Sequence, residues 1–169
     1  PKGAKIIDAK GKTVLPGLMD LHVHIFQMIG PLNYLERFMI PKSLSLLYAV
    51  KHVHQLLEAG FTTCRDLVYP FPDYIGRDAV SLRTALERNI IQGCRLEVAG
   101  VVTSTASHLD VIRPITLRGK HITADGVDEV RKITRKCISE QVDWIKTCTT
   151  GGMAGGFTNN PNFKNYTLD

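Results

Sequence analysis

The sequence of 169 residues has no long apolar run and no closely spaced pair of cysteines. Without a stretch that could span a bilayer, it predicts no membrane-embedded protein and no membrane partner. Its four cysteines are far apart, which argues against a disulfide framework and against a structural zinc knuckle. No signal peptide is recognisable, although a chain that begins at Pro1 would hide one. We therefore expect a protein of a reducing compartment, the cytoplasm.

The sequence also lacks internal repeats, low-complexity tracts and a concentrated basic patch. Its net charge is +5, and the densest basic cluster is interleaved with apolar residues at helical spacing: Arg131, Lys132, Arg135 and Lys136 with Val127, Val130, Ile133 and Cys137. This pattern is typical of the solvated face of an amphipathic helix, and we favour that interpretation over a nucleic-acid-binding surface. With 44% hydrophobic and 22% charged residues, the composition is that of a globular protein, and we expect no nucleic-acid partner.

The most informative stretch, Val14–His24, is apolar and ends in two histidines one residue apart. It predicts a buried strand. Because side chains alternate across a strand, His22 and His24 point to the same side and can close on one metal ion. Zinc accepts imidazole nitrogens at about 2.0–2.1 Å, a geometry that such a pair can reach without backbone strain. The stretch therefore indicates a catalytic metal at the C-terminal end of a strand in a parallel α/β enzyme.

A second His-Val-His occurs at His52 and His54, in a segment whose apolar residues recur at helical spacing. Two positions along a helix correspond to about 200° of rotation, so these two rings face different directions and cannot hold one ion. We expect both to be ordinary helix residues.

Apolar patterning alternates between strand and helix along the chain. The expected strands cover residues 14–25, 61–67, 95–102 and 143–149, and the expected helices cover 43–59, 76–89 and 127–141. Gly60 is the expected C-cap of the first helix, and Asp125 is the expected N-cap of the last. We also expect a short strand at residues 5–9 and an extended loop over residues 103–124.

The resulting order, β-α-β-α-β-α-β, demands parallel strands with right-handed crossovers. Four such strands could form a doubly wound α/β sheet. They could equally form about half of a (β/α)8 TIM barrel, which uses eight strands over about 250 residues.

In such barrels, catalytic residues lie at the C-terminal ends of different strands. By this rule, the candidate site residues at strand ends are His22, His24, Arg65, Asp66 and Lys146. The loop after the third expected strand adds His108. A lysine inside a strand is costly to bury charged, so desolvation favours a neutral Lys146 amine that can form a carbamate with carbon dioxide. The alternatives are a lysine that extends to the barrel mouth, or one that pairs with Asp143 or Asp66.

Three segments together resemble one enzyme family. Gly11–His24 resembles the opening signature of the metal-dependent amidohydrolase superfamily, Ala59–Asp66 its second-strand segment, and Trp144–Gly152 its carbamylated-lysine strand. The likeness is to the imidazolonepropionase-related branch, which contains prolidase-like and arginine-carboxypeptidase-like enzymes. It runs in order through nearly the whole chain.

The resemblance implies roles for individual residues. His22 and His24 would ligate the more buried of two zinc ions, and carbamylated Lys146 would bridge both. A metal-activated hydroxide would attack an amide bond in a small-molecule or dipeptide-like substrate. His108 would contact the substrate, although the glycines that commonly precede it in relatives are absent, so a surface-loop histidine is the alternative. Arg65 and Asp66 could pair with each other as structural groups, which we favour over direct catalysis.

The resemblance also implies a larger protein. Two further histidine ligands and a proton-transferring aspartate belong at later strand ends, and no histidine follows Lys146. We therefore expect residues 13–169 to be the N-terminal half of the barrel, which its C-terminal half would complete. We also expect the protein to form a homo-oligomer. Residues 1–12 would end a flanking β-sandwich. The alternatives are a single-metal cyclic-amide hydrolase or deaminase of the same superfamily, and an inactive fragment or interaction module.

Overall fold

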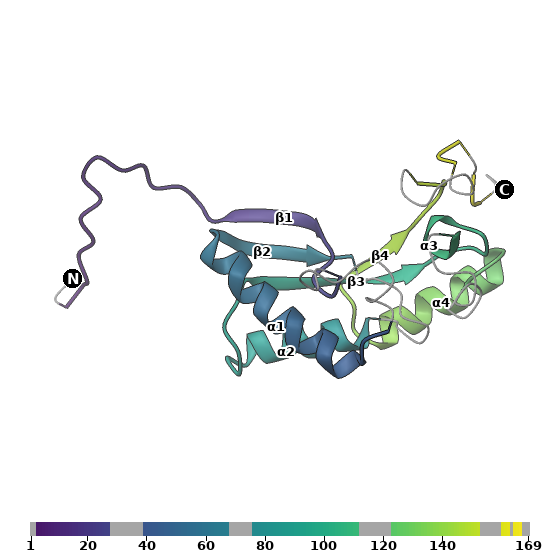
Figure 1. Cartoon of the computed structure of the whole chain (residues 1–169), viewed down its shortest axis with the longest axis horizontal. Coiled ribbons are helices and arrows are strands. Elements are labelled where there is room, and N and C mark those ends of the chain that lie inside the picture. The colour runs from purple at the N-terminus through teal and green to yellow at the C-terminus, as the bar shows by residue number, and fades with distance from the viewer. Residues whose placement is uncertain are drawn as a thin grey trace.

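The computed structural model of the chain describes residues 3–27, 39–67, 76–111, 123–152, 160–162 and 164–166. Strands and helices alternate along it: β1 (Leu18–Val23), α1 (Lys42–Glu58), β2 (Phe61–Asp66), α2 (Arg77–Glu87), β3 (Arg95–Val102), α3 (His108–Val111), α4 (Val127–Ser139) and β4 (Trp144–Thr147). Within these residues, the strands pair in parallel in the order β1-β2-β3-β4. The long helices α1, α2 and α4 cover one face of the sheet (Figure 1).

The strand order decides between the two parallel architectures. A doubly wound sheet reverses its strand order at a switch point and carries helices on both faces. Here each strand pairs with its neighbour in sequence, and the long helices lie on the same side (Figure 1). The sheet is therefore the first half of a (β/α)8 barrel, with an outer face covered by helices and an inner face that belongs to the lumen.

The core lies between the sheet and its helices. Its largest fully buried side chains include Val53 of α1, Leu82 of α2 and Val98 of β3. α4 approaches β3 closely at Gly100, where an added Cβ would lie 2.7 Å from the Cys137 side chain. Burial of this apolar surface stabilises the half-barrel and holds the strand ends in position.

Most of the expected elements are confirmed, with small shifts at their boundaries. Gly60 follows α1 with a φ of +94°, the left-handed conformation that glycine adopts at a helix end. Asp125 does not cap α4, because its carboxylate accepts hydrogen bonds from the backbone N–H and the hydroxyl of Thr105. Gly126 occupies the N-cap position instead. A contact with a distant loop therefore replaces the expected local cap.

The N-terminal part differs from the prediction. Residues 5–9 do not form a strand, because a strand needs a hydrogen-bonding neighbour and the described residues provide none there. They belong to an arm that leads away from the sheet (Figure 1), in which Ile6 is 91% exposed. β1 is shorter than the expected 14–25 and is not buried, since it forms an edge of the sheet and leaves Met19 66% exposed. The assignment of residues 1–12 to a flanking domain stays a prediction.

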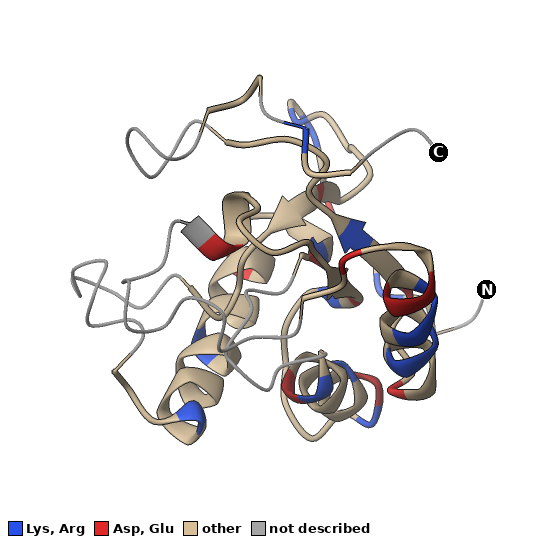
Figure 2. Cartoon of the chain, turned by 90° about the vertical axis from the view of Figure 1, so that its right-hand side faces the viewer, with Lys and Arg blue, Asp and Glu red and all other residues tan. Residues whose placement is uncertain are grey.

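Charged residues of both signs lie on the helices (Figure 2). α4 carries Asp128 and Glu129 in its first turn, and Arg131 of the basic cluster pairs with Asp128. The positive charge of α4 is thus partly balanced on the same helix, and the expectation of no nucleic-acid partner stays a prediction. In the described part of the chain, no helix combines the length and the apolar character needed to cross a membrane.

Candidate metal centre

Two histidines lie together at the C-terminal end of β1. The centroids of the His22 and His24 rings are 5.4 Å apart, and the ring planes meet at 78°. This is the arrangement predicted from the alternation of side chains along a strand. The structure therefore brings the two rings side by side, as expected, and their sharing of one ion stays a prediction.

Both imidazoles are held in the neutral form. Burial, followed by the charges of His22, Lys146 and His108, lowers the pKa of His24 to about 4. Burial and then the charge of Lys146 also lower the pKa of His22. A neutral imidazole offers the free lone pair that a metal requires. Because the charges of Lys146 and His108 act on His24, these two residues lie in the same region as the histidine pair.

His24 also carries a ring nitrogen without a hydrogen bond. Its Nδ1 is buried, and no partner for it occurs among the described residues. Burying a polar atom without a partner is costly, and such an atom in a native structure calls for an explanation such as an ion. Two neutral imidazoles side by side, one of them incompletely bonded, fit a zinc ion, which prefers nitrogen ligands of this kind.

The described residues would supply only part of a metal site. Zinc is usually bound tetrahedrally, and within the described ranges no group of three or more His, Cys, Asp or Glu side chains is placed to hold an ion. Lys146 would add an oxygen ligand only as a carbamate. The fit to a metal therefore rests on His22 and His24, and further ligands must come from elsewhere.

The backbone that follows His24 is held from both sides. The N–H of Ile25 donates to Asp66 Oδ1 at 3.1 Å, and the carbonyl of Ile25 accepts from His52 Nδ1 at 2.8 Å. Asp66 is fully buried. These contacts tie the end of β1 to β2 and to α1, so they restrict the movement of His24. Neither role was predicted from the sequence; for Asp66, the available signal was a carboxylate near the C-terminal end of an expected strand.

The second His-Val-His lies on α1, as predicted. His54 faces solvent and pairs with Glu58, with 3.3 Å between Nε2 and Oε1. His52 instead stacks on Tyr48 and binds the Ile25 carbonyl. The two rings serve different partners and do not share a site. His52 is nevertheless more than an ordinary helix residue, because it anchors β1.

Lys146 is half-buried on β4. Asp143, one of its suggested partners, accepts hydrogen bonds from Arg83 and from a backbone N–H of β3. Asp66, the other suggested partner, accepts from Ile25. Among the described residues, neither carboxylate forms an ion pair with Lys146. Its carbamylation stays a prediction.

His108 begins α3, a single helical turn inside the region expected to be an extended loop; residues 112–122 of that region lie outside the described residues. The His108 ring packs on Gly152, which follows β4: a Cβ added at Gly152 would lie 2.2 Å from His108 Nδ1. His108 is therefore half-buried and near His24, rather than a histidine of a surface loop. Its contact with a substrate stays a prediction.

A hydrogen-bonded turn presents His108. The hydroxyls of Thr103 and Ser107 bond to each other, and the N–H of Ala106 donates to Asp110 Oδ2 at 3.0 Å. Ala106 has a φ of +57°, a conformation that most residues avoid. The roles of these residues were not predicted from the sequence, although serine and threonine before the histidine are typical turn formers.

Arg65 and Asp66 have separate contacts instead of pairing with each other. Successive strand residues point to opposite faces. Asp66 binds Ile25, whereas Arg65 Nε donates to the carbonyl of Leu21 at 2.9 Å. The guanidinium carbon of Arg65 also lies 4.8 Å from the centre of the Trp144 ring. Arg65 therefore lies on the inner face, near the histidine pair.

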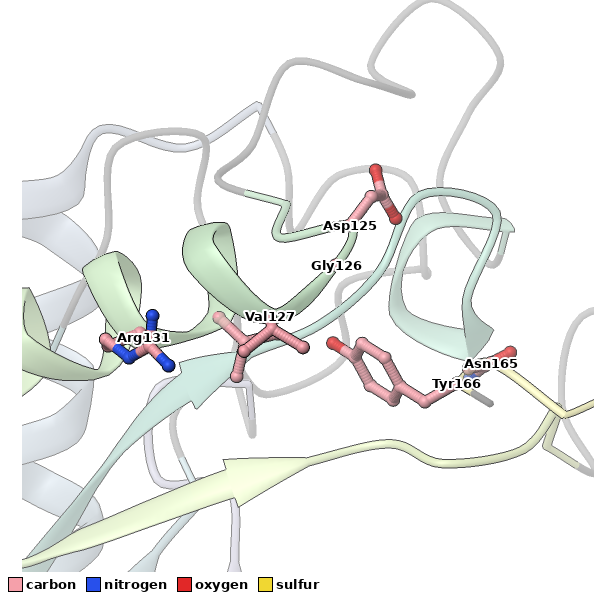
Figure 3. A pocket seen from close by; sticks show the side chains of 7 residues that line it. Asp125, Gly126, Val127, Arg131, Asn165 and Tyr166 are labelled. Carbon is pink, nitrogen blue, oxygen red and sulfur yellow. The ribbon is translucent and has the colours of Figure 1, made fainter. Parts of the chain in front are cut away.

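One cavity borders the histidine pair. It has a volume of about 510 Å³ between β1 and α1, and its lining includes His22, His24 and His52. A second cavity, of about 530 Å³, lies at the N-terminal end of α4, where Tyr166 points toward Val127 (Figure 3). His22, His24, His108 and Lys146 are all absent from the lining of the second cavity, so this cavity gives no support to a site there.

Comparison with known proteins identifies the family. Residues 13–167 match the Amidohydrolase family. The chain belongs to this family. No curated protein matches the chain significantly.

Solved structures of amidohydrolases share its fold. One amidohydrolase is 31% identical with a TM-score of 0.80, and the match covers 99% of this chain and 41% of the other. A prolidase complexed with N-methylphosphonate-L-proline is 29% identical with a TM-score of 0.77, over 99% of this chain and 41% of the other. A Xaa-Pro dipeptidase with bound methionine is 25% identical with a TM-score of 0.69, over 90% and 37%. The chain thus spans about two fifths of these amidohydrolases, which confirms the predicted family and the half-barrel.

Proposed function

We propose that the protein containing this chain is a metal-dependent amidohydrolase that cleaves an amide bond in a peptide-like or N-acyl amino-acid substrate. The observation that carries the proposal is the convergence of Lys146 and His108 on a neutral, paired His22 and His24 at the inner strand ends. Membership of the amidohydrolase family supports the same chemistry.

In this proposal, His22 and His24 would hold one of two zinc ions, and Lys146 would contact both as a carbamate formed from carbon dioxide. When bound, the metal would lower the pKa of water and polarise the amide carbonyl. The chain's own residues prepare the site. Burial keeps both imidazoles neutral, and the anchored Ile25 peptide group holds His24 at the strand end.

Related structures support a dipeptide-like substrate. One of them is a prolidase solved with N-methylphosphonate-L-proline, and another is a Xaa-Pro dipeptidase. His108 would contact the substrate beside the metal ligands, since its packing on Gly152 holds the ring at this end of the sheet. Assembly as a homo-oligomer and a cytoplasmic location remain further predictions.

Metal content and a Lys146 variant test the proposal. The purified full-length protein should bind two equivalents of zinc and hydrolyse a Xaa-Pro dipeptide. Lys146→Ala should lose the second equivalent and lower kcat/KM by more than about 100-fold, because the group common to both metals is gone. Lys132→Ala, which removes an exposed lysine of α4, is the matched control and should change neither quantity.

Each other outcome has a defined meaning. Two metals retained in Lys146→Ala would contradict the carbamate bridge. A single equivalent in the wild type would favour a single-metal cyclic-amide hydrolase or deaminase. No metal in the wild type would favour a non-catalytic interaction module.

A further inference from the structure

Arg65 of β2 contacts both edge strands of the half-barrel. Its Nε donates to the Leu21 carbonyl on β1 at 2.9 Å, and its guanidinium carbon lies 4.8 Å from the centre of the Trp144 ring on β4. Neighbouring strands lie about 4.8 Å apart, so β1 and β4 would be about 14 Å apart across a flat sheet. The Arg65 guanidinium and the Trp144 indole together bridge that distance on the inner face.

A third side chain fixes the plane of the indole. Trp144 Nε1 donates to Glu97 Oε2 of β3 at 2.6 Å. Glu97 is the residue opposite Arg65 in the register of β2 and β3. A continuous series of contacts therefore runs from the Leu21 carbonyl through Arg65 and Trp144 to Glu97, with one group on each strand.

This series lies one layer below the proposed metal ligands. Leu21 directly precedes His22 on β1, and Trp144 lies two residues before Lys146, on the same face of β4. A shift of either contact would therefore move a metal-binding side chain. Since the carbonyl of Leu21 and the indole of Trp144 meet at a single guanidinium, the two strands cannot separate without breaking one of these contacts.

We propose that Arg65 is a positioning residue that sets the separation between His22 and Lys146 through its simultaneous contacts with Leu21 and Trp144. The proposal rests on the proposed function, in which these two side chains bind metal. Arginine suits the role because its planar group can stack on an aromatic ring while an N–H in the same plane donates to a carbonyl. A lysine ammonium has no plane with which to make both contacts.

The experiment compares Arg65→Met and Arg65→Lys in the full-length protein. After metal removal, zinc affinity is measured by competition with a chromogenic chelator, alongside kcat and KM. Both variants should bind zinc about 10–100-fold more weakly, the usual effect of removing a group that orients a metal ligand. We expect kcat to fall while KM changes less than about threefold, because Arg65 acts through the ligands rather than on the substrate.

Arg83→Met is the matched control. Arg83 also braces β4, but from the outer face, where it binds Asp143 and the Gln141 carbonyl. Its loss should lower the thermal midpoint without weakening zinc binding. A general loss of stability would weaken zinc binding equally in Arg65→Met and Arg83→Met. Weaker zinc binding in Arg65→Met alone therefore supports a positioning role, and equal affinities in the two variants overturn it.

Restoration of wild-type affinity by Arg65→Lys would also overturn the proposal, since charge alone would then suffice. If Arg65→Met does not fold, Trp144→Phe and Trp144→Leu provide the same comparison. The phenyl ring keeps a face for the guanidinium and should retain most of the affinity that leucine loses; equal affinities would again overturn the inference. If the inference fails while the wild type still binds zinc tightly, the proposed function stands. A wild type without zinc affinity refutes both the proposed function and the positioning role of Arg65.

Discussion

The tripeptide His-Val-His occurs twice in this chain, and the two copies have different surroundings. At the end of β1, the rings of His22 and His24 lie 5.4 Å apart in an edge-to-face arrangement. On α1, His52 binds a backbone carbonyl and His54 pairs with Glu58 in solvent. Because the residues are identical, the backbone conformation decides which copy can chelate an ion.

The two copies also differ in the residues that the fold places around them. The β1 copy lies near Lys146 and His108, whose charges join burial in keeping His24 neutral. Within the described residues, the α1 copy bears on that region through His52, which binds the carbonyl of Ile25 just after the other copy. A short motif therefore acquires its chemistry from the element that carries it and from the residues that the fold places beside it.

The largest effect should come from removing one member of the β1 pair. His24→Ala should weaken zinc binding to the full-length protein by more than about 100-fold, because it removes a proposed direct ligand. His54→Ala removes the equivalent residue of the α1 copy and should leave the affinity unchanged. Chelator competition measures both. Similar losses in the two variants would abolish the distinction between strand and helix copies.

The next effect concerns the anchor supplied by β2. Asp66→Ala leaves the Ile25 N–H without its acceptor and should cost about 1–3 kcal/mol of unfolding free energy, measured by urea denaturation. Asp66→Asn keeps an oxygen acceptor and should recover most of that loss. If alanine and asparagine were equally destabilising, the hydrogen bond to Ile25 would not be the source of the effect.

Acid should weaken the metal-free protein through the β1 copy. The pKa of His24 falls from 6.5 to about 4 on folding, so the unfolded state takes up more protons between these values. The contribution of His24 to the free energy of unfolding is therefore fully present above pH 6.5 and is lost as the pH falls toward 4. We expect a loss of about 1–2 kcal/mol, allowing for solvent that still reaches the ring. His24→Asn should flatten this part of the Tm profile; an unaltered profile would argue against a neutral His24.

The smallest effect should come from the α1 residue that supports the β1 copy. His52→Leu removes the donor to the Ile25 carbonyl and should cost about 1 kcal/mol of unfolding free energy. His52→Gln can still donate and serves as the control. Hydrogen exchange at the end of β1 should quicken in the leucine variant alone, and equal exchange in both would assign no anchoring role to His52.

Much of the fold was predictable because it depends on residues close together in sequence. Apolar periodicity located β2, β3 and α1, and Gly60 marked the end of α1. The pairing of His22 and His24 was predictable for the same reason, since two residues on one strand need no information from elsewhere in the chain.

The remaining features depend on contacts between distant segments. Asp125 satisfies the pattern of a helix cap but binds Thr105 instead. Alternation along the strand separates Arg65 from Asp66, but the contact of Arg65 with Trp144 depends on a strand that is distant in sequence. Residues 5–9 fit a strand pattern, yet a strand needs a partner to pair with. No local sequence pattern predicts these contacts.

Transplanting the His22–His24 pair into another scaffold would require more than the tripeptide. The peptide group of Ile25 is clamped by Asp66 from the next strand and by His52 from the intervening helix. All of these residues belong to one β-α-β unit, β1-α1-β2, whose strands are hydrogen-bonded neighbours. That unit is the smallest portable form of the half-site. A graft that lacks Asp66 or His52 would carry the same imidazoles on a strand end whose backbone is less restrained.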